Sequence, residues 1–142
     1  MSGSDIFGIV GSALAAQNAR MGAIASNLAN VDSITPPGAA PYRAHEVVFE
    51  AAPVTGANGA NTADMGVQVV GTVQSSAPPV KKYDPGSPYA NAKGYVTGSN
   101  VSQVSQMVDL IDSSSSYSAS IAVLQQASRI DQQMLASFQV SP

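Results

Sequence analysis

The chain has 142 residues, enough for one domain of ordinary size or for a small core with helical arms. Charged residues make up only 11% of it, against about a quarter in an average domain, so its surface is poorly suited to a free monomer. The net charge of -3 argues against a nucleic-acid partner, because no basic stripe is available to contact phosphates. Without cysteine, neither disulfides nor thiol chemistry can contribute.

Residues 1–32 are predicted to form an N-terminal assembly helix. Apolar residues recur there in alternating steps of three and four, which is typical of a helix that packs along a partner helix. They are Phe7, Val10, Leu14, Met21, Ile24 and Leu28, with Gln17 at one position of the same stripe. Asn30 is expected to supply a left-handed C-cap, and Pro36-Pro37 prevents the helix from continuing.

The middle, residues 33–99, is predicted to be a small β-rich domain. Proline and glycine indicate a loop at its start, and a Gly/Ala/Asn-rich segment at 51–66 is expected to be a flexible loop. Alternating apolar residues predict strands over 42–50, 67–73 and 80–83, and residues 94–96 lead the chain toward the second helix.

Residues 100–142 are predicted to form a C-terminal assembly helix. Asn100 is expected to cap it, with Gln103 reaching back in a capping box. Four serines at 113–116 are poor helix formers and mark the expected place of a bend. The helical stripe consists of Met107, Leu110, Ser114, Tyr117, Ile121, Leu124, Ser128, Asp131, Leu135 and Phe138.

The fold class predicted from these elements is α+β, with the two terminal helices forming a coiled-coil-like arm beside the small β domain. At the standard rise the helices would be about 40 Å and about 57 Å long, whereas a compact piece the size of the middle has a radius of gyration of only about 10 Å. The helices must therefore lie against each other and against other subunits.

The residues expected at these contacts are apolar residues of the two stripes and polar residues of the first. Leu14, Met21, Ile24 and Leu28 should pack with Tyr117, Ile121, Leu124 and Leu135. Polar register contacts are expected from Gln17, Asn18, Arg20, Asn27 and Asn30. Simple exposure to solvent is the alternative for these polar side chains.

The sequence offers little for catalysis, so no catalytic residue, cofactor or metal is expected. His45 is the only histidine, which excludes a two-histidine metal site within one chain. An exposed structural role is expected for it, with a hydrolase using His45 as the remote alternative. Asp109 and Asp112 share a helix face, and a solvated polar face explains them. The spacing of the apolar residues alone is also compatible with an alternative function, a free-standing adaptor whose helices hold one partner in a closed bundle.

The first residues lack the basic region and long apolar core of a cleavable signal, and no segment approaches the length of a membrane span. Neither direct membrane insertion nor removal of a leader is therefore expected. If the protein leaves the cytoplasm, it should do so without signal cleavage.

Several short motifs indicate a family. Residues 12–17, SALAAQ, followed by ASNLAN at 25–30 and VDS at 31–33, resemble the N-terminal signature of bacterial flagellar rod and hook proteins. The middle resembles the proximal-rod type of that family, whose distal-rod and hook relatives carry a much larger middle domain. The matching segments of the middle are PYR at 41–43, VVF at 47–49, YDPG at 83–86, GYV at 94–96 and NV at 100–101. Those of the closing helix are MV at 107–108, SY at 116–117 and ASIAVL at 119–124.

The resemblance implies a structural subunit of the proximal rod that performs no catalysis and transmits torque. The implied partners are copies of itself, other flagellar rod proteins, the basal-body ring at the inner membrane and the flagellar type III export machinery. The implied location is the periplasmic rod of the basal body. Where the family usually has a proline before Asn100-Val101, this chain has Gly98-Ser99, so a looser start of the second helix is expected.

Overall fold

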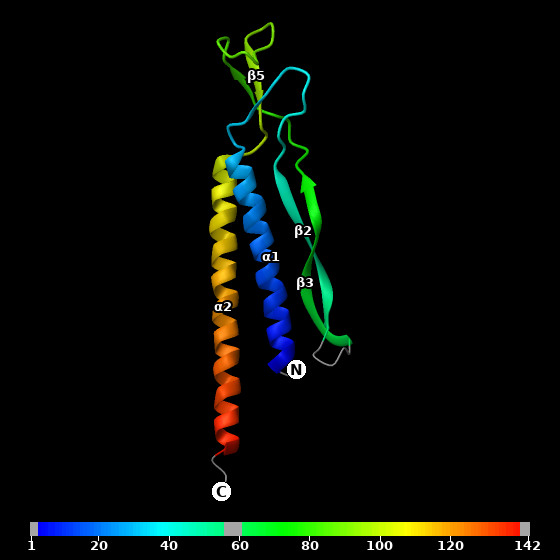
Figure 1. Cartoon of the computed structure of the whole chain (residues 1–142), viewed down its shortest axis with the longest axis vertical. Coiled ribbons are helices and arrows are strands. Elements are labelled where there is room, and N and C mark those ends of the chain that lie inside the picture. Colours follow the sequence, from blue (N-terminus) through cyan, green and yellow to red (C-terminus); the bar gives the residue numbers. More distant parts are fainter. Residues whose placement is uncertain (1–2, 56–60, 140–142) are drawn as a thin grey trace. The chain divides into compact units, whose positions relative to one another are not determined.

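The computed structural model describes residues 3–55 and 61–139, which form an α+β fold of two long helices and five strands (Figure 1). The predicted fold class is confirmed. In chain order the elements are α1 (Gly3–Ala29), β1 (Ile34–Thr35), β2 (His45–Thr55), β3 (Asn61–Gln74), β4 (Lys81–Tyr83), β5 (Tyr95–Gly98) and α2 (Gln103–Gln139). Neither helix, over the described residues, combines the length and the apolar character needed to cross a membrane.

The chain divides into two compact units, each of which contains part of both helices. Unit 1 consists of Met1–Ala19, Phe49–Val70 and Ser113–Pro142, and unit 2 of Arg20–Val48 and Gly71–Asp112. Among the described residues, the buried hydrophobic side chains are Val10 and Ala16 in unit 1 and Ile24, Ala44, Val96 and Val101 in unit 2. Each core is therefore small. The predicted division at 1–32, 33–99 and 100–142 stays a prediction.

Helix α1 ends differently from the expected left-handed cap. Among the described residues only glycines have positive φ, so Asn30 is not left-handed. Instead, the backbone tightens, with the amide of Asn30 donating to the carbonyl oxygen of Asn27 at 3.1 Å. The side-chain Nδ2 of Asn30 donates to the free carbonyl oxygen of Ser26 at 2.9 Å. The Asn30 side chain thus provides a hydrogen bond to a carbonyl oxygen at the end of the helix, where the prediction expected a left-handed backbone cap.

Strands β2 and β3 form a two-stranded sheet and correct the predicted loop at 51–66. Residues 51–55 belong to β2 and 61–66 to β3, while 56–60 lie outside the described residues. Within unit 1, an ideal Cβ on Gly8 would lie 2.5 Å from Cγ1 of Val54, and one on Gly66 would lie 2.6 Å from Oγ of Ser12. The two glycines therefore permit close packing of the strands on α1, and the sequence interpretation had assigned the segment that contains Gly66 to a flexible loop.

The remaining strands form an antiparallel sheet in unit 2 with the order β1-β5-β4. The predicted strand at 80–83 corresponds to β4. The sequence interpretation took residues 34–35 for loop, but Ile34 pairs with Gly98, and Thr35 with Thr97. This two-residue strand is too short to show a periodicity of its own.

The start of α2 also corrects the sequence interpretation. Ser102 is the capping residue, because its Oγ accepts the amide of Ser105 at 3.4 Å and its carbonyl oxygen accepts the amide of Gln106 at 3.0 Å. Asn100 instead bridges loops: its Oδ1 accepts the amide of Ala44 at 2.7 Å, and its Nδ2 donates to Ala77 at 2.9 Å. Helix α2 continues without interruption through the four serines.

Ser99, at the expected loose start of the second helix, is buried and held in place. Its hydroxyl donates to the carbonyl oxygen of Val31 at 2.8 Å, and its own carbonyl oxygen accepts the amide of Val80 at 3.2 Å. The expectation of a loose start to the second helix is therefore wrong, because these hydrogen bonds fix the chain just before α2.

Candidate assembly interface

In unit 2, α1 and α2 lie side by side and run in opposite directions (Figure 1). Asn27 of α1 donates to Oε1 of Gln106 at 2.8 Å, and Arg20, two turns earlier in α1, faces Asp109 and Asp112, which come later in α2. Residues later in α1 therefore contact residues earlier in α2, so the two helices are antiparallel. The sequence predicted that the helices would pair, and these contacts set their register.

Asn27 is the centre of this pairing, with a side chain only 1% exposed. Besides the bond to Gln106, its Nδ2 donates to the carbonyl oxygen of His45 at 2.9 Å. Its Oδ1 accepts the amide of His45 at 2.8 Å and the hydroxyl of Tyr42 at 3.1 Å. All the hydrogen-bonding positions of the amide are therefore satisfied within the chain. The polar register contact expected of Asn27 thus forms within one protomer, where the side chain joins α1, β2 and α2.

His45 is half-buried rather than exposed, and its Nδ1 lies 3.1 Å from the Tyr42 hydroxyl oxygen. Because Tyr42 gives its only proton to Asn27, Nδ1 of His45 must be the donor in this pair. The described residues contain no group of three or more His, Cys, Asp or Glu that could hold a metal ion. The exposure expected for His45 is therefore wrong, because its ring lies beside Tyr42, and its structural role stays a prediction.

Arg20 holds the two aspartates that the sequence assigned to a solvated face. Its guanidinium lies 4.0 Å from Oδ1 of Asp109 and 3.7 Å from Oδ2 of Asp112. Both carboxylates remain exposed, as expected of a solvated face, and α1 also supplies a cation to that side of α2. These pairs are loose and partly exposed, so each contributes at most about 1 kcal/mol to stability.

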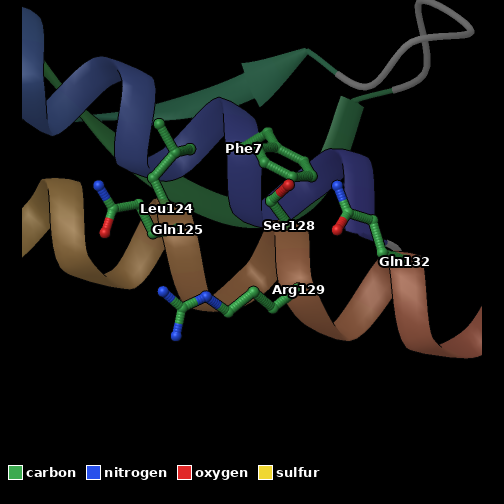
Figure 2. Close-up of a pocket in the computed structure, with 6 residues that line it drawn as sticks. All are labelled: Phe7, Leu124, Gln125, Ser128, Arg129 and Gln132. Atoms are coloured by element: carbon green, nitrogen blue, oxygen red, sulfur yellow. The ribbon is translucent and has the colours of Figure 1, made fainter.

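In unit 1, α1 and α2 leave a hollow of about 430 Å³ between them, which we call the unit-1 hollow. Figure 2 shows its lining, in which Leu124, Ser128 and Gln132 point from α2 toward α1 while Arg129 extends away from α1. The lining residues are Phe7, Leu124, Gln125, Ser128, Arg129 and Gln132. The hollow combines an apolar floor with a polar rim that carries one cation.

Among the described residues of unit 1, two buried polar atoms have no hydrogen-bond partner, the Oε1 of Gln17 and the Oγ of Ser113. The Ser113 side chain is fully buried. Buried polar groups without partners cost stability, so the pairing of α1 with α2 is poorly satisfied at these positions. Gln17 was predicted as a subunit contact, and its oxygen is instead enclosed by its own chain.

The other predicted interface residues divide by exposure. Ile24 is buried, Asn18 is exposed, and most of the others are half-buried, namely Leu14, Met21, Leu28, Asn30, Tyr117, Ile121 and Leu124. Leu135 is 65% exposed, because Phe7 near the start of α1 already lies beside residues 124–132 of α2. Whether these residues contact other subunits stays a prediction.

The sequence interpretation missed a second apolar side of α2, in unit 2. We call it the α2 stripe, and its members are Val104, Met107, Val108 and Ile111, 48% to 75% exposed. Their spacing of three and four residues was the available signal. Of these four residues, only Met107 belongs to the apolar stripe predicted from the sequence, because that prediction followed the heptad pattern along one face of the helix.

Two family models match the ends of the chain. The model described as "Flagella basal body rod protein" matches residues 9–36, which include most of α1. The model described as "Flagellar basal body rod FlgEFG protein C-terminal" matches residues 92–137, which include β5 and nearly all of α2. The matched regions are therefore the two helices and the strand that leads into the second.

The chain is also similar to several proteins named flagellar basal-body rod protein FlgC. It is 49% identical over 120 residues to the one from Escherichia coli O6:H1, covering 84% of this chain and 86% of the relative. The Yersinia enterocolitica relative is 44% identical over 124 residues, covering 87% and 89% of the two chains. The Bacillus subtilis relative is 35% identical over 124 residues, covering 80% and 83%.

Proposed function

Because this chain belongs to the flagellar basal-body rod protein family, with FlgC-type relatives matching most of its length, we propose that it polymerises through its terminal helices into the proximal rod. Its family membership confirms the resemblance that the motifs indicated, and its function is that of a structural rod subunit. In this proposal the rod crosses the periplasm and transmits torque, and the subunit performs no catalysis.

The observation that carries the proposal is the apolar surface of α2 that its own chain leaves uncovered. Besides the α2 stripe in unit 2, this surface includes a row in unit 1: Val123, Ile130, Met134, Leu135 and Phe138. Burying a large apolar side chain contributes about 1.5 to 3 kcal/mol. Contacts between unlike surfaces of successive copies would cover these residues and extend the assembly without closing it.

The proposed partners are copies of the same chain and other rod proteins. At its base the rod would meet the ring at the inner membrane, and delivery would use the flagellar type III export machinery without signal cleavage. The absence of cysteine suits a chain that crosses unfolded into an oxidising space. Because α1 and α2 pair within one chain, an exported subunit could refold this helix pair at the growing end of the rod.

A charge placed on the exposed end of α2 tests the proposal. Leu135→Glu should leave the monomer folded, because the side chain already lies in water, but it should prevent burial against a neighbour. Cells whose only copy carries this change should lose swimming motility and complete rods. Gln133→Glu, an exposed neighbour given the same charge, should leave both unchanged.

Both variants should still be exported, which immunoblotting of the periplasm and culture medium would check. Normal basal bodies and motility in Leu135→Glu cells would contradict polymerisation through this end of α2.

A further inference from the structure

We propose that the α2 stripe of one copy docks into the unit-1 hollow of a second copy, with Asp112 of the first facing Arg129 of the second. This inference rests on the proposed function, because it names one contact by which copies would assemble. The occupant of the hollow is a second copy of this chain, which presents an exposed apolar row beside a negative charge.

The α2 stripe faces away from α1. Successive residues of a helix are rotated by about 100°, so Val104, Val108 and Ile111 lie opposite Gln106, whose side chain Asn27 binds. The chain's own first helix therefore covers the other side of α2 in unit 2. A rigid helical row of branched side chains is left for a partner to cover.

The α2 stripe has an excess of negative charge beside it. Asp109 and Asp112 share the single guanidinium of Arg20, which leaves one carboxylate charge unbalanced. Asp112 is the more exposed of the two and lies one turn after Val108, on the flank of the stripe. A partner that covers the stripe would gain by presenting a cation at this flank.

The unit-1 hollow offers the matching features. Phe7 and Leu124 provide an apolar floor, and Arg129 stands at the rim, extending away from α1 (Figure 2). Arg129 is the only arginine or lysine in the sequence of unit 1. It makes no ion pair with any described residue. The hollow thus combines an apolar floor with an unpaired positive charge. The α2 stripe combines an apolar row with an unbalanced negative charge, so the two surfaces are complementary.

The two surfaces belong to different parts of the chain, and in this proposal they meet in a heterologous contact. Each copy uses its stripe on one neighbour and its hollow on another, and such contacts repeat without closing unless the rotation forms a ring. A symmetric dimer would instead make the contact reciprocally, with each stripe in the partner's hollow, and would stop at two copies. The proposed contact therefore provides the open repetition that a rod requires.

Cysteine cross-linking tests the contact directly, because the chain has no cysteine of its own. Ile111→Cys places a thiol on the stripe and Ser128→Cys places one in the hollow. In basal bodies from cells that co-express the two single variants, mild oxidation should give a dimer that contains one of each. A chain carrying both changes should give a ladder of larger products, because each copy then has a link on both sides.

Ser115→Cys is the matched control, since Ser115 is an exposed serine of α2 outside the hollow. Paired with Ile111→Cys, it should give at least about tenfold less dimer, because disulfides require Cα atoms within about 7 Å.

Charge exchange tests the ion pair separately. Arg129→Glu should weaken association of the copies by about tenfold per contact, the effect of losing about 1.4 kcal/mol. Asp112→Arg should weaken it similarly, and the variant with both changes should regain most of the loss because the pair is restored with reversed signs. Circular dichroism of each purified variant should match the parent chain. Equal loss in the double and single variants would overturn the ion pair.

The outcomes separate this inference from the proposed function. If the chain assembles into basal bodies but Ile111→Cys and Ser128→Cys do not cross-link above the Ser115→Cys control, the docking contact is wrong while polymerisation stands. If neither the parent chain nor the cysteine variants are found in basal bodies, the proposed function fails first.

Discussion

Asn27 shows how a single polar side chain can fix the register of two helices. Each hydrogen bond of its amide contributes only about 0.5 to 1.5 kcal/mol, but leaving its buried partners unpaired would cost more. The partners come from β2, from α2 and from the loop before β2, so any shift of α2 along α1 would break several bonds together. A contact of this kind selects one register, which a stripe of similar apolar residues does poorly.

Asn27→Ala should lower the free energy of unfolding by about 2 to 4 kcal/mol, because the backbone amide and carbonyl oxygen of His45 and the Oε1 of Gln106 lose their bonds to Asn27. Urea denaturation of the purified chain, followed by circular dichroism, measures this. Asn18→Ala, at an exposed position of the same helix, should change stability by less than about 0.5 kcal/mol. Equal stability of the two variants would contradict the role assigned to Asn27.

At the scale of elements, glycine has two different consequences along α1. Gly8 faces Val54 of β2 so closely that a methyl group has no room, whereas Gly22 has no atom within 4 Å of its absent Cβ. Valine is restricted in its rotamers and cannot simply turn away from the added methyl. The first glycine therefore lets strand β2 approach the helix, and the second only weakens the helix.

Gly8→Ala should destabilise the chain by about 1 to 3 kcal/mol, because it overpacks the contact with Val54. Gly22→Ala is the matched substitution and should stabilise it by up to about 1 kcal/mol through helix propensity. Thermal denaturation of the two purified variants and the parent chain measures whether each substitution lowers or raises stability. A stabilising effect of Gly8→Ala would show that β2 does not pack against α1 at this position.

At the scale of the whole molecule, the uncovered apolar surface is large compared with the core. Among the described residues, twenty large hydrophobic side chains are exposed, while only six hydrophobic residues are buried. Each unit is therefore held by few buried contacts, and the end of α2 has none, since residues 132–138 are all exposed. Segments with so little burial open easily in an isolated chain.

Amide hydrogen exchange on a dilute monomer should accordingly find the terminal helices mobile, with residues 132–138 of α2 exchanging fastest. The same amides should be protected when the chain is part of basal bodies, because partners then cover the helix. Strong protection of both terminal helices in the dilute monomer would contradict this expectation.

The sequence by itself determined the two helices and the family. A stripe that repeats every three or four residues over many turns allows only one local structure, and the motifs at 12–33 and 107–124 identify the rod proteins. It also led to the expectation that the subunit performs no catalysis, because the sequence has one histidine and no cysteine. These conclusions depend on residues that are close together in the chain.

Only the tertiary structure decided where the polar and small residues act. Asn27 and Asn100 bind groups far away in the sequence, Arg20 faces aspartates of another helix, and Gly8 and Gly66 admit side chains from distant segments. Local pattern suggested a cap for Asn100, solvent for the aspartates and flexibility for the Gly/Ala-rich strands. The physical reason is that hydrogen bonds and close contacts depend on which segments meet, whereas helical periodicity is a property of one segment alone.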